Sequence, residues 1–213
     1  MSLILHAYWR SGTSYRTRIG LNLKGVAYAT TTINLRAGEH LSAEFRNLNP
    51  QGLAPVLEAD DVVLTQSSAI LEWLEERYPN PPLLPVRLAD RAMVRAMGAV
   101  IACDIHPLNN MRVMSQLRDQ FSATPEAEGA WMRKWMHSGF EALEMMIRRH
   151  GRGFCFGDHP TLADCHLVPQ VYAADRFGVD MSPFPSIRAV VSAMSALPAV
   201  ADAHPNQQPD ADQ

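Results

Sequence analysis

A hydroxyl-rich turn near the start of the chain carries the first residues that could do chemistry. Arg10, Ser11, Thr13 and Ser14 follow a short apolar run, and a helix-like stretch that ends at Gly25 comes after them. A helix N-terminus presents unpaired backbone N–H groups and the positive end of the helix dipole, so it favours a carboxylate, a phosphate or a thiolate. Capping of the helix by Ser11 or Thr13 is the more usual role of such residues. The local sequence therefore predicts that a helix starts here, and it leaves open whether the hydroxyl groups cap the helix or bind an anion.

A second group of polar residues lies around Pro107. At about 100° per residue, His106, Asn109 and Asn110 fall on one helix face with Arg112 at its edge. Proline removes a helical hydrogen bond, so we expect a kink or an interruption here. Two interpretations stay open. Either these side chains line a cleft, or the asparagines satisfy backbone groups that the proline leaves free and His106 is a hydrogen-bonded, partly buried residue.

Two charged residues lie near opposite ends of a helix expected at residues 161–177. Thr161 followed by Asp164 resembles a capping box, which favours a structural role for this acid. Arg176 is either a solvated cation favoured by the helix dipole or a ligand for an anion. Arg176 therefore remains a candidate, whereas Asp164 is assigned to the fold.

The elements around the hydroxyl-rich turn predict a mixed α/β unit. Strands are expected at residues 3–8, 29–34, 53–57 and 62–65, and helices at residues 12–24, 36–49 and 69–78. A right-handed crossover makes the first two strands parallel, which places the turn at the carboxyl end of a strand, a natural ligand site. The last two strands predict an antiparallel hairpin, and Ser67 or Ser68 is the expected N-cap of the helix after it.

A proline-rich stretch separates this unit from an all-helical part. Residues 79–85 contain four prolines, which cannot continue a helix and which stiffen an extended connection. Helical periodicity is expected at residues 88–121, 125–150, 161–177 and 185–196. The predicted organisation is an α/β domain at residues 1–79, a linker at 80–87 and an all-α domain at 88–213. Its polar end, from Ala199 onward, is expected to be mobile.

Composition narrows the class of function. With 19 basic and 22 acidic residues the net charge is −3, which gives no electrostatic reason to bind nucleic acid or an anionic membrane. No apolar run approaches the roughly 20 residues of a membrane span, and no signal peptide is evident. Three widely spaced cysteines match neither a zinc site nor a disulfide framework. We expect a cytoplasmic protein that binds a small molecule or a protein, without a metal.

Taken together, these features resemble the cytosolic glutathione transferases. The shared features are the β-α-β-α-β-β-α order, a proline before the third strand, the Gln66-Ser67 pair, the proline linker and the all-α domain. Within that family, the runs Arg10–Ile19 and Cys103–Asn110 are similar to the two signatures of the zeta class. The resemblance implies a thioredoxin-like N-terminal domain that binds glutathione and an all-α C-terminal domain that binds substrate.

The resemblance also implies which residues hold glutathione in the first domain. Gln66 and Ser67 match the pair that holds the γ-glutamyl end. Ala54 matches the residue whose backbone pairs with the cysteinyl part, and Pro55 after it is expected to be cis. His40 matches a position near the glycyl carboxylate. All three portions of the tripeptide therefore have an expected partner.

The turn departs from the usual zeta pattern in one respect. Ser11 and Thr13 match the positions beside the glutathione sulfur, but the common pattern Ser-Ser-Cys reads Ser11, Gly12 and Thr13 here. No protein cysteine is available at this turn. The expected nucleophile is therefore the sulfur of glutathione itself, its thiolate favoured by the helix N-terminus and by hydroxyl donors.

The activity implied by the resemblance is a cis–trans isomerisation of maleylpyruvate to fumarylpyruvate, in gentisate-type aromatic catabolism. A thiolate adds to the activated double bond, the resulting single bond rotates, and the thiolate leaves. Donors near the substrate carbonyl would stabilise the charge that develops there. Because the substrate is a dicarboxylate and guanidinium groups bind carboxylates in bidentate fashion, Arg10, Arg112 and Arg176 are the candidate ligands.

The second-domain cluster is expected to contribute further contacts. Asn109 and Asn110 are assigned to the substrate, and Asp104, His106 and Asn110 to glutathione. The expected catalytic residues are Arg10, Ser11, Thr13 and His106.

Two other functions stay open. A maleylacetoacetate isomerase of tyrosine and phenylalanine breakdown shares the mechanism and differs only in the substrate's tail. A non-catalytic glutathione-binding module would keep the fold without the reaction, although it has no need of three arginines at one cleft. The resemblance also implies a homodimer in which the first domain of one subunit meets the second domain of the other.

Overall fold

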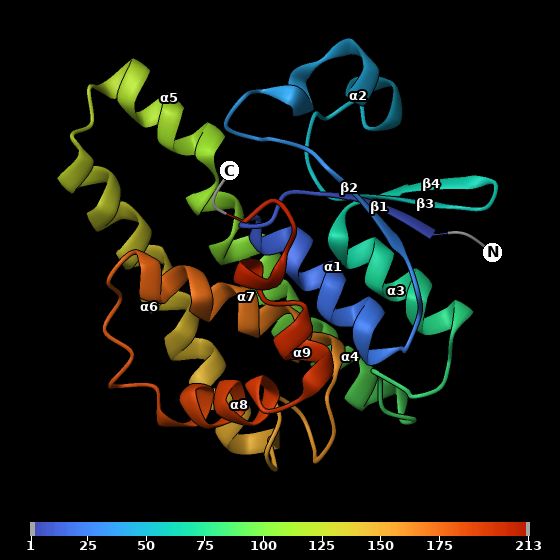
Figure 1. The fold of residues 1–213 in the computed structure, drawn as a ribbon. Helices are drawn as coiled ribbons and strands as arrows, with labels where there is room; N and C mark the ends of the chain where they lie inside the picture. The colour runs from blue at the N-terminus through green and yellow to red at the C-terminus, as the bar shows by residue number, and fades with distance from the viewer. Residues whose placement is uncertain (1–2, 212–213) are drawn as a thin grey trace. The chain divides into compact units, whose positions relative to one another are not determined.

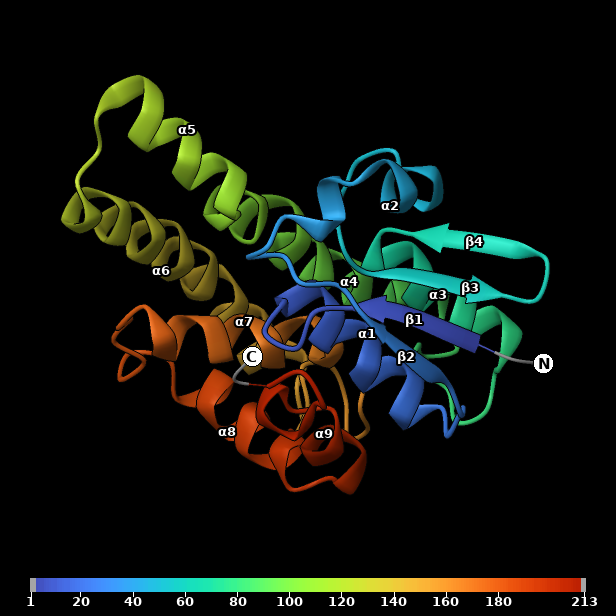
Figure 2. The same ribbon diagram turned by 45° about the horizontal axis from the view of Figure 1, so that its top comes forward.

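The computed structural model describes residues 3–211 of the chain. Two compact units are present (Figures 1 and 2). The first unit ends at Pro82 and takes up the chain again from Ser195, and the second comprises Leu83–Met194. The boundary between them lies within the predicted linker.

The first unit is built on a four-stranded sheet. Its strands are β1 (Leu3–Ala7), β2 (Ala29–Thr32), β3 (Val56–Ala59) and β4 (Val62–Thr65), in the order β2-β1-β3-β4. The predicted parallel pairing of β1 with β2 and the predicted β3–β4 hairpin are both confirmed. In the two-residue hairpin loop, Asp60 has a φ of 51°, as a tight hairpin turn requires.

The helices of this unit pack their apolar residues against the sheet and one another. They are α1 (Gly12–Leu23), α2 (Ala43–Leu48) after a 3₁₀ turn at Glu39–Leu41, α3 (Ser67–Arg77) and α9 (Pro198–Asp202). The core contains Leu5, Ile19 and Ile70, which are fully buried. Helix α1 meets α3 so closely that a Cβ on Gly20 would lie 2.2 Å from Leu71 Cδ2. A side chain at position 20 therefore does not fit this packing.

Two basic residues of α1 and its C-cap residue, Lys24, are buried, and each is paired. Arg16 donates to Ser67, and Arg18 donates to two backbone carbonyls. Lys24 Nζ lies 2.5 Å from a Glu75 carboxylate oxygen and also donates to the Pro81 carbonyl. Buried cations persist only with such partners. The helix is therefore held by polar contacts as well as by its apolar side.

The segment after Leu197 differs from the prediction. Its polar composition predicts a mobile extension of the all-α domain, but the structure groups it with the first unit. Helix α9 is followed by a 3₁₀ turn at Pro205–Gln207, and both Ala203 and Asp210 are buried. Asn22 Nδ2 in α1 donates to the Ala199 carbonyl at 2.9 Å. The predicted domain at residues 88–213 is therefore too long at its end.

The second unit is helical, as predicted. It contains α4 (Leu88–Ala99), a π-helix (Val100–Ile105), a 3₁₀ turn (Pro107–Asn109), α5 (Met111–Phe121), α6 (Pro125–His150), α7 (Leu162–Arg176) and α8 (Pro185–Ser195). Phe140, Leu143 and Ile187 are buried in its core. The carboxylate of Glu144 in α6 accepts the Ser186 and Ile187 N–H groups at the start of α8, each at 3.0 Å. Among the described residues, no helix has the length and apolar character needed to cross a membrane.

Candidate functional site

The turn between β1 and α1 is organised by two hydroxyl groups. Ser11 is the N-cap of α1, and its Oγ accepts from the Ser14 N–H at 3.2 Å, so the predicted cap is confirmed. Thr13 Oγ1 donates to the Ala54 carbonyl oxygen at 2.9 Å. Because Thr13 has only one hydroxyl proton, Ser11 must be the donor in the 2.9 Å contact between the two side chains. A ligand anion at this terminus would attract the Ser11 proton and leave Thr13 bound to Ala54.

Ala54 lies just outside the sheet. The β1–β3 register ends at the His6–Val56 pair, and the Ala54–Pro55 peptide bond is cis, as expected. The loop before it is held by Asn49, whose Nδ2 donates to the Leu53 carbonyl at 2.6 Å. The backbone at Ala54 is therefore fixed in place but takes no part in the strand ladder.

His40 lies beside the same loop, in the 3₁₀ turn before α2. A Cβ on Gly52 would lie 3.0 Å from the His40 carbonyl oxygen, so the loop and the turn are closely packed. Burial, and secondarily the positive charge of Arg46, lowers the pKa of His40 below its ordinary value. Its Nδ1 is buried and has no hydrogen-bond partner among the described residues. The environment of His40 therefore favours its neutral form, and one nitrogen of its ring makes no hydrogen bond within the described residues.

The start of α3 has the properties of an anion site. Its N-cap is Gln66, not a serine as predicted, and the Gln66 side chain makes no capping hydrogen bond. Gln66 has a φ of 65°, a conformation that costs about 1–3 kcal/mol in a non-glycine residue and recurs at ligand sites. No acidic residue occupies the first turn. The terminal N–H groups and the Ser67 hydroxyl are therefore not neutralised by a carboxylate of this helix.

Arg10 lies on an aromatic surface at the other side of the turn. Its guanidinium carbon is 5.2 Å from the centroid of the Trp9 ring, which is itself buried. No carboxylate among the described residues pairs with Arg10. The cation is therefore oriented by packing against a ring and is not held by a carboxylate of the described residues.

The second predicted cluster follows a break in the helix. The His106 N–H donates to the Ile101 carbonyl at 2.8 Å, an i−5 contact that ends the π-helix just before Pro107. Asn109 Nδ2 donates to the Ile105 carbonyl at 3.0 Å, and Asn110 is the N-cap of α5. The asparagines therefore do serve backbone groups near the proline, as one of the two interpretations expects.

The same cluster also has one buried polar atom that the fold does not use. Asn109 Oδ1 is buried without a hydrogen-bond partner among the described residues. Trp131 Nε1 on α6 donates to the Leu108 carbonyl at 2.8 Å, which fixes the 3₁₀ turn. His106 is half-buried, and Asp104 is exposed. A rigid turn thus presents a histidine and an unsatisfied amide oxygen.

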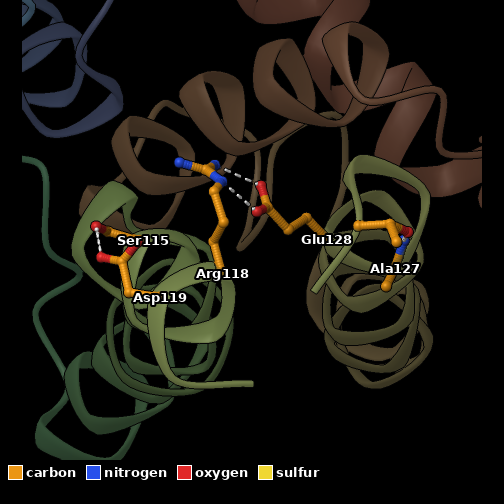
Figure 3. Close-up of polar contacts among 6 residues, drawn as sticks. Ser115, Arg118, Asp119, Ala127 and Glu128 are labelled. Carbon is orange, nitrogen blue, oxygen red and sulfur yellow. Dashed lines mark hydrogen bonds and ion pairs between the residues drawn. The ribbon is translucent and has the colours of Figure 1, made fainter. Parts of the chain in front are cut away.

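Arg112 lies exposed in the first turn of α5, whose far end is tied to α6. Arg118 binds Glu128 through two hydrogen bonds, of 2.9 and 2.8 Å (Figure 3). Thr124 caps the start of α6 by accepting from the Ala127 N–H. A bidentate pair fixes direction as well as distance, so it restrains the orientation of α5.

Arg176 and Asp164 lie at opposite ends of α7, as predicted. The Asp164 carboxylate is buried and accepts from the Thr161 and Cys155 N–H groups, each at 2.8 Å, so the capping box is confirmed. Burial raises the pKa of Asp164, although these hydrogen bonds act in the opposite direction. Arg176 is exposed between the rings of Tyr172 and Phe177.

The structure thus joins only some of the predicted residues. In the first unit, hydrogen bonds join Ser11, Thr13 and Ala54, while Gln66 and Ser67 share the start of α3. Sequence reasoning missed Arg16, which is buried against Ser67. The sequence did contain a signal for a buried arginine. Residues two apart on a helix point in directions about 200° apart, so Arg16 and Arg18 cannot both lie on one solvent-facing side of the helix. Within the described residues, no group of His, Cys, Asp or Glu side chains could hold a metal.

Comparison with known proteins identifies the family. Models of the glutathione S-transferase N-terminal and C-terminal domains match residues 10–77 and 117–202. A maleylpyruvate isomerase from Ralstonia sp is 51% identical, over 97% of this chain and 98% of that protein.

Solved structures give the same result. The holo structure of a maleyl pyruvate isomerase, described as a bacterial zeta-class glutathione S-transferase, is similar with a TM-score of 0.95 and 49% identity, covering 99% of this chain and 100% of that one. A maleylacetoacetate isomerase from Anaeromyxobacter dehalogenans 2CP-1, with bound GSH in its active site, has a TM-score of 0.89 and 44% identity, covering 99% and 98%. The predicted thioredoxin-like and all-helical fold is confirmed, and the chain belongs to the glutathione S-transferase family.

Proposed function

We propose that this protein is a zeta-class, glutathione-dependent cis–trans isomerase that converts maleylpyruvate to fumarylpyruvate. The observation that carries the proposal is the start of α1, where two hydroxyl groups and free N–H groups meet without any protein thiol. Such a terminus favours a thiolate that a ligand brings. The similarity to maleylpyruvate isomerases over nearly the whole chain supports the choice of reaction.

The first unit fits glutathione at three places. The start of α3, with Gln66 and Ser67, suits the γ-glutamyl carboxylate because it offers N–H groups and no acid. The backbone of Ala54, beyond the strand ladder, suits an extended peptide. His40, with an unused ring nitrogen, suits the glycyl carboxylate. When bound, glutathione supplies the thiolate that adds to the substrate double bond and leaves after rotation.

The residues of the turn then have separate tasks. Ser11 turns its hydroxyl proton from Thr13 toward the sulfur and so favours the ionised form. Thr13 keeps its bond to the Ala54 carbonyl and holds the peptide-binding loop against α1. Arg10 supplies a cation for a substrate carboxylate or for the carbonyl oxygen on which charge develops.

We retain the candidates of the second unit as ligands. Arg112 and Arg176 are proposed to bind substrate carboxylates, since both guanidinium groups are exposed. Asn109, whose Nδ2 gives only one of its two protons to the Ile105 carbonyl, and Asn110 are proposed to contact the substrate. Further proposed contacts to glutathione come from Asp104, His106 and Asn110. Replacing Arg176 with alanine should impair substrate turnover while leaving glutathione affinity near that of the wild type.

The deciding experiment compares substrates with purified protein. Turnover of maleylpyruvate and of maleylacetoacetate is measured with and without glutathione, and kcat/KM is compared. We expect activity only with glutathione and a higher kcat/KM for maleylpyruvate. A higher value for maleylacetoacetate would make that the substrate, an alternative supported by the similarity to a maleylacetoacetate isomerase. Glutathione binding without turnover of either compound would indicate a non-catalytic module.

We also propose a cytoplasmic homodimer. The three free cysteines Cys103, Cys155 and Cys165 suit a reducing compartment. Val62 and Val63 leave apolar surface exposed on the edge strand β4, which suits contact with another subunit. Light scattering of the purified protein measures the oligomeric state.

A further inference from the structure

Trp9 connects the end of β1 to the hydroxyl-rich turn, and both its backbone polar groups are bound. The Trp9 N–H donates to Asp210 Oδ2 at 3.0 Å. The Trp9 carbonyl accepts from Arg18 Nη2 at 2.9 Å. The next residue, Arg10, lies over the Trp9 ring, and Ser11 follows. The conformation of Trp9 therefore sets the start of the turn that carries the proposed site residues Arg10, Ser11 and Thr13.

Both restraints on Trp9 lead to the segment after α9. Asp210 belongs to that segment, although it lies 201 residues away from Trp9 in sequence. Arg18 also donates from Nε to the Ala203 carbonyl at 2.9 Å, so one buried guanidinium joins Trp9 to the same segment. Figure 1 shows α9 and the turn that follows it beside α1. A part of the chain with a polar composition is thus fastened to the turn.

Asp210 differs from the other contacts of this segment. Asn22 holds α9 to α1 through the Ala199 carbonyl, and Arg18 holds the segment after α9 through the Ala203 carbonyl. Asp210 instead places a carboxylate, 8% exposed, on the backbone of the turn itself. A hydrogen bond to a buried carboxylate is strong and directional. Because other hydrogen bonds already attach α9 and the segment after it to α1, attachment alone does not require the bond from Trp9 to Asp210.

We propose that Asp210 is a positioning residue for the turn at residues 10–13. By holding the Trp9 N–H, its carboxylate fixes the direction in which Arg10 and the Ser11 cap leave β1, and so keeps the site arranged before any ligand binds. This role rests on the proposed function, because it assigns glutathione and the substrate to that turn. Nothing in the sequence around Asp210 indicates it.

The test compares three variants of the full-length protein. Asp210→Ala removes the acceptor, and Asp210→Asn keeps an oxygen acceptor without the charge. Asn22→Ala removes a hydrogen bond that holds the neighbouring helix α9 to α1 and does not involve the turn. The readouts are glutathione affinity by calorimetry, the pH titration of the bound thiol, thermal stability, and amide hydrogen exchange at residues 8–14 without ligand.

We expect Asp210→Ala to weaken glutathione binding about tenfold and to speed exchange in the turn, with Asp210→Asn recovering most of the loss. Asn22→Ala should lower thermal stability and leave both affinity and exchange in the turn unchanged. Equal behaviour of Asp210→Ala and Asn22→Ala would overturn the inference. If Asp210→Ala does not fold, Asp210→Glu serves as the test. Its carboxylate is displaced by one methylene group, so the folded variant should have a lower affinity for glutathione. An unchanged affinity would overturn the inference.

The hydrogen-exchange measurement separates this inference from the proposed function. A wild-type protein that binds no glutathione would refute the function, yet exchange at residues 8–14 in Asp210→Ala would still show whether Asp210 holds the turn. A wild-type protein that binds glutathione, with Asp210→Ala unchanged in affinity and exchange, would refute the inference alone.

Discussion

The guanidinium of Arg16 donates to the Ser67 hydroxyl oxygen at 3.0 Å and so joins the middle of α1 to the first residue of α3. Both side chains are buried. Because the Ser67 oxygen accepts from a cation, its own proton remains for a ligand at the start of α3. The strained backbone of Gln66 lies directly before it. A buried arginine on one helix thus orients the hydroxyl group at the N-terminus of another, where we propose that the γ-glutamyl carboxylate binds.

Replacing Ser67 with alanine should weaken glutathione binding at least tenfold, about the loss expected for one hydrogen bond to a charged group. Calorimetry measures the affinity. Ser68→Ala is the matched control, since it removes the next hydroxyl of α3 and leaves the Arg16 contact in place. Equal losses in the two variants would show that Ser67 has no special role.

Ser11 and Thr13 should respond differently to the loss of their hydroxyl groups. Ser11→Ala removes the proton proposed to turn toward the sulfur, so it should raise the pKa of the bound thiol and lower kcat by about 10². Thr13→Val instead frees the Ala54 carbonyl and should mainly raise the KM for glutathione. Ultraviolet titration of the bound thiol and steady-state kinetics measure the two effects.

The control for this pair is Ser14→Ala. The Ser14 hydroxyl belongs to the same turn but accepts from the Tyr8 N–H at 3.4 Å, away from Thr13. This variant should leave the thiol pKa unchanged. A rise in the thiol pKa with Thr13→Val as large as with Ser11→Ala would contradict the separate roles.

Much of the fold follows from local signals. Apolar periodicity, the prolines of the linker and the two-residue hairpin loop each act within a few residues, so the sequence predicts the order of strands and helices from β1 to α3 and the helical class of the second unit. The helix expected at residues 36–49 is instead a 3₁₀ turn followed by the shorter α2, and β3 begins at Val56 instead of Leu53. The break at Pro107 is predicted too, because proline removes a specific hydrogen bond. Its form, a π-helix followed by a 3₁₀ turn, depends on packing that periodicity does not record.

Helix α9 and the segment after it show where such signals end. Ala199, Ala203 and Asp210 are held by hydrogen bonds to residues far away in sequence, and such bonds leave no mark on local composition. Arg16 is missed for a related reason, since an arginine in a helix usually faces water. The Ser11 cap is predicted because it depends on neighbouring residues. The roles of Arg112, Arg176 and His106 remain predictions.

Gly20 allows α1 and α3 to approach each other, so Gly20→Ala should destabilise the protein by about 1–3 kcal/mol through overpacking against Leu71. Chemical denaturation measures the change. Gly129→Ala in α6 is the control, because its Cβ would meet only the flexible end of Arg133 and should be neutral or stabilising. In a Leu71→Ala background, Gly20→Ala should cost less stability than it does in the wild type if the clash with Leu71 is the cause.

His204 should make stability depend on pH in a predictable direction. Burial, and secondarily Arg18, lowers its pKa below the ordinary 6.5, and its Nδ1 accepts from the Asn206 N–H, which protonation would prevent. The unfolded chain therefore binds the proton more readily, so the free energy of unfolding should fall as pH drops below 6.5 and should not depend on His204 above it. His204→Asn keeps a hydrogen-bond acceptor and should reduce this fall in the free energy of unfolding, measured by denaturation at several pH values. The same change at the exposed His159 is the control and should not reduce it. Equal pH dependence of the wild type and His204→Asn would refute the role of His204.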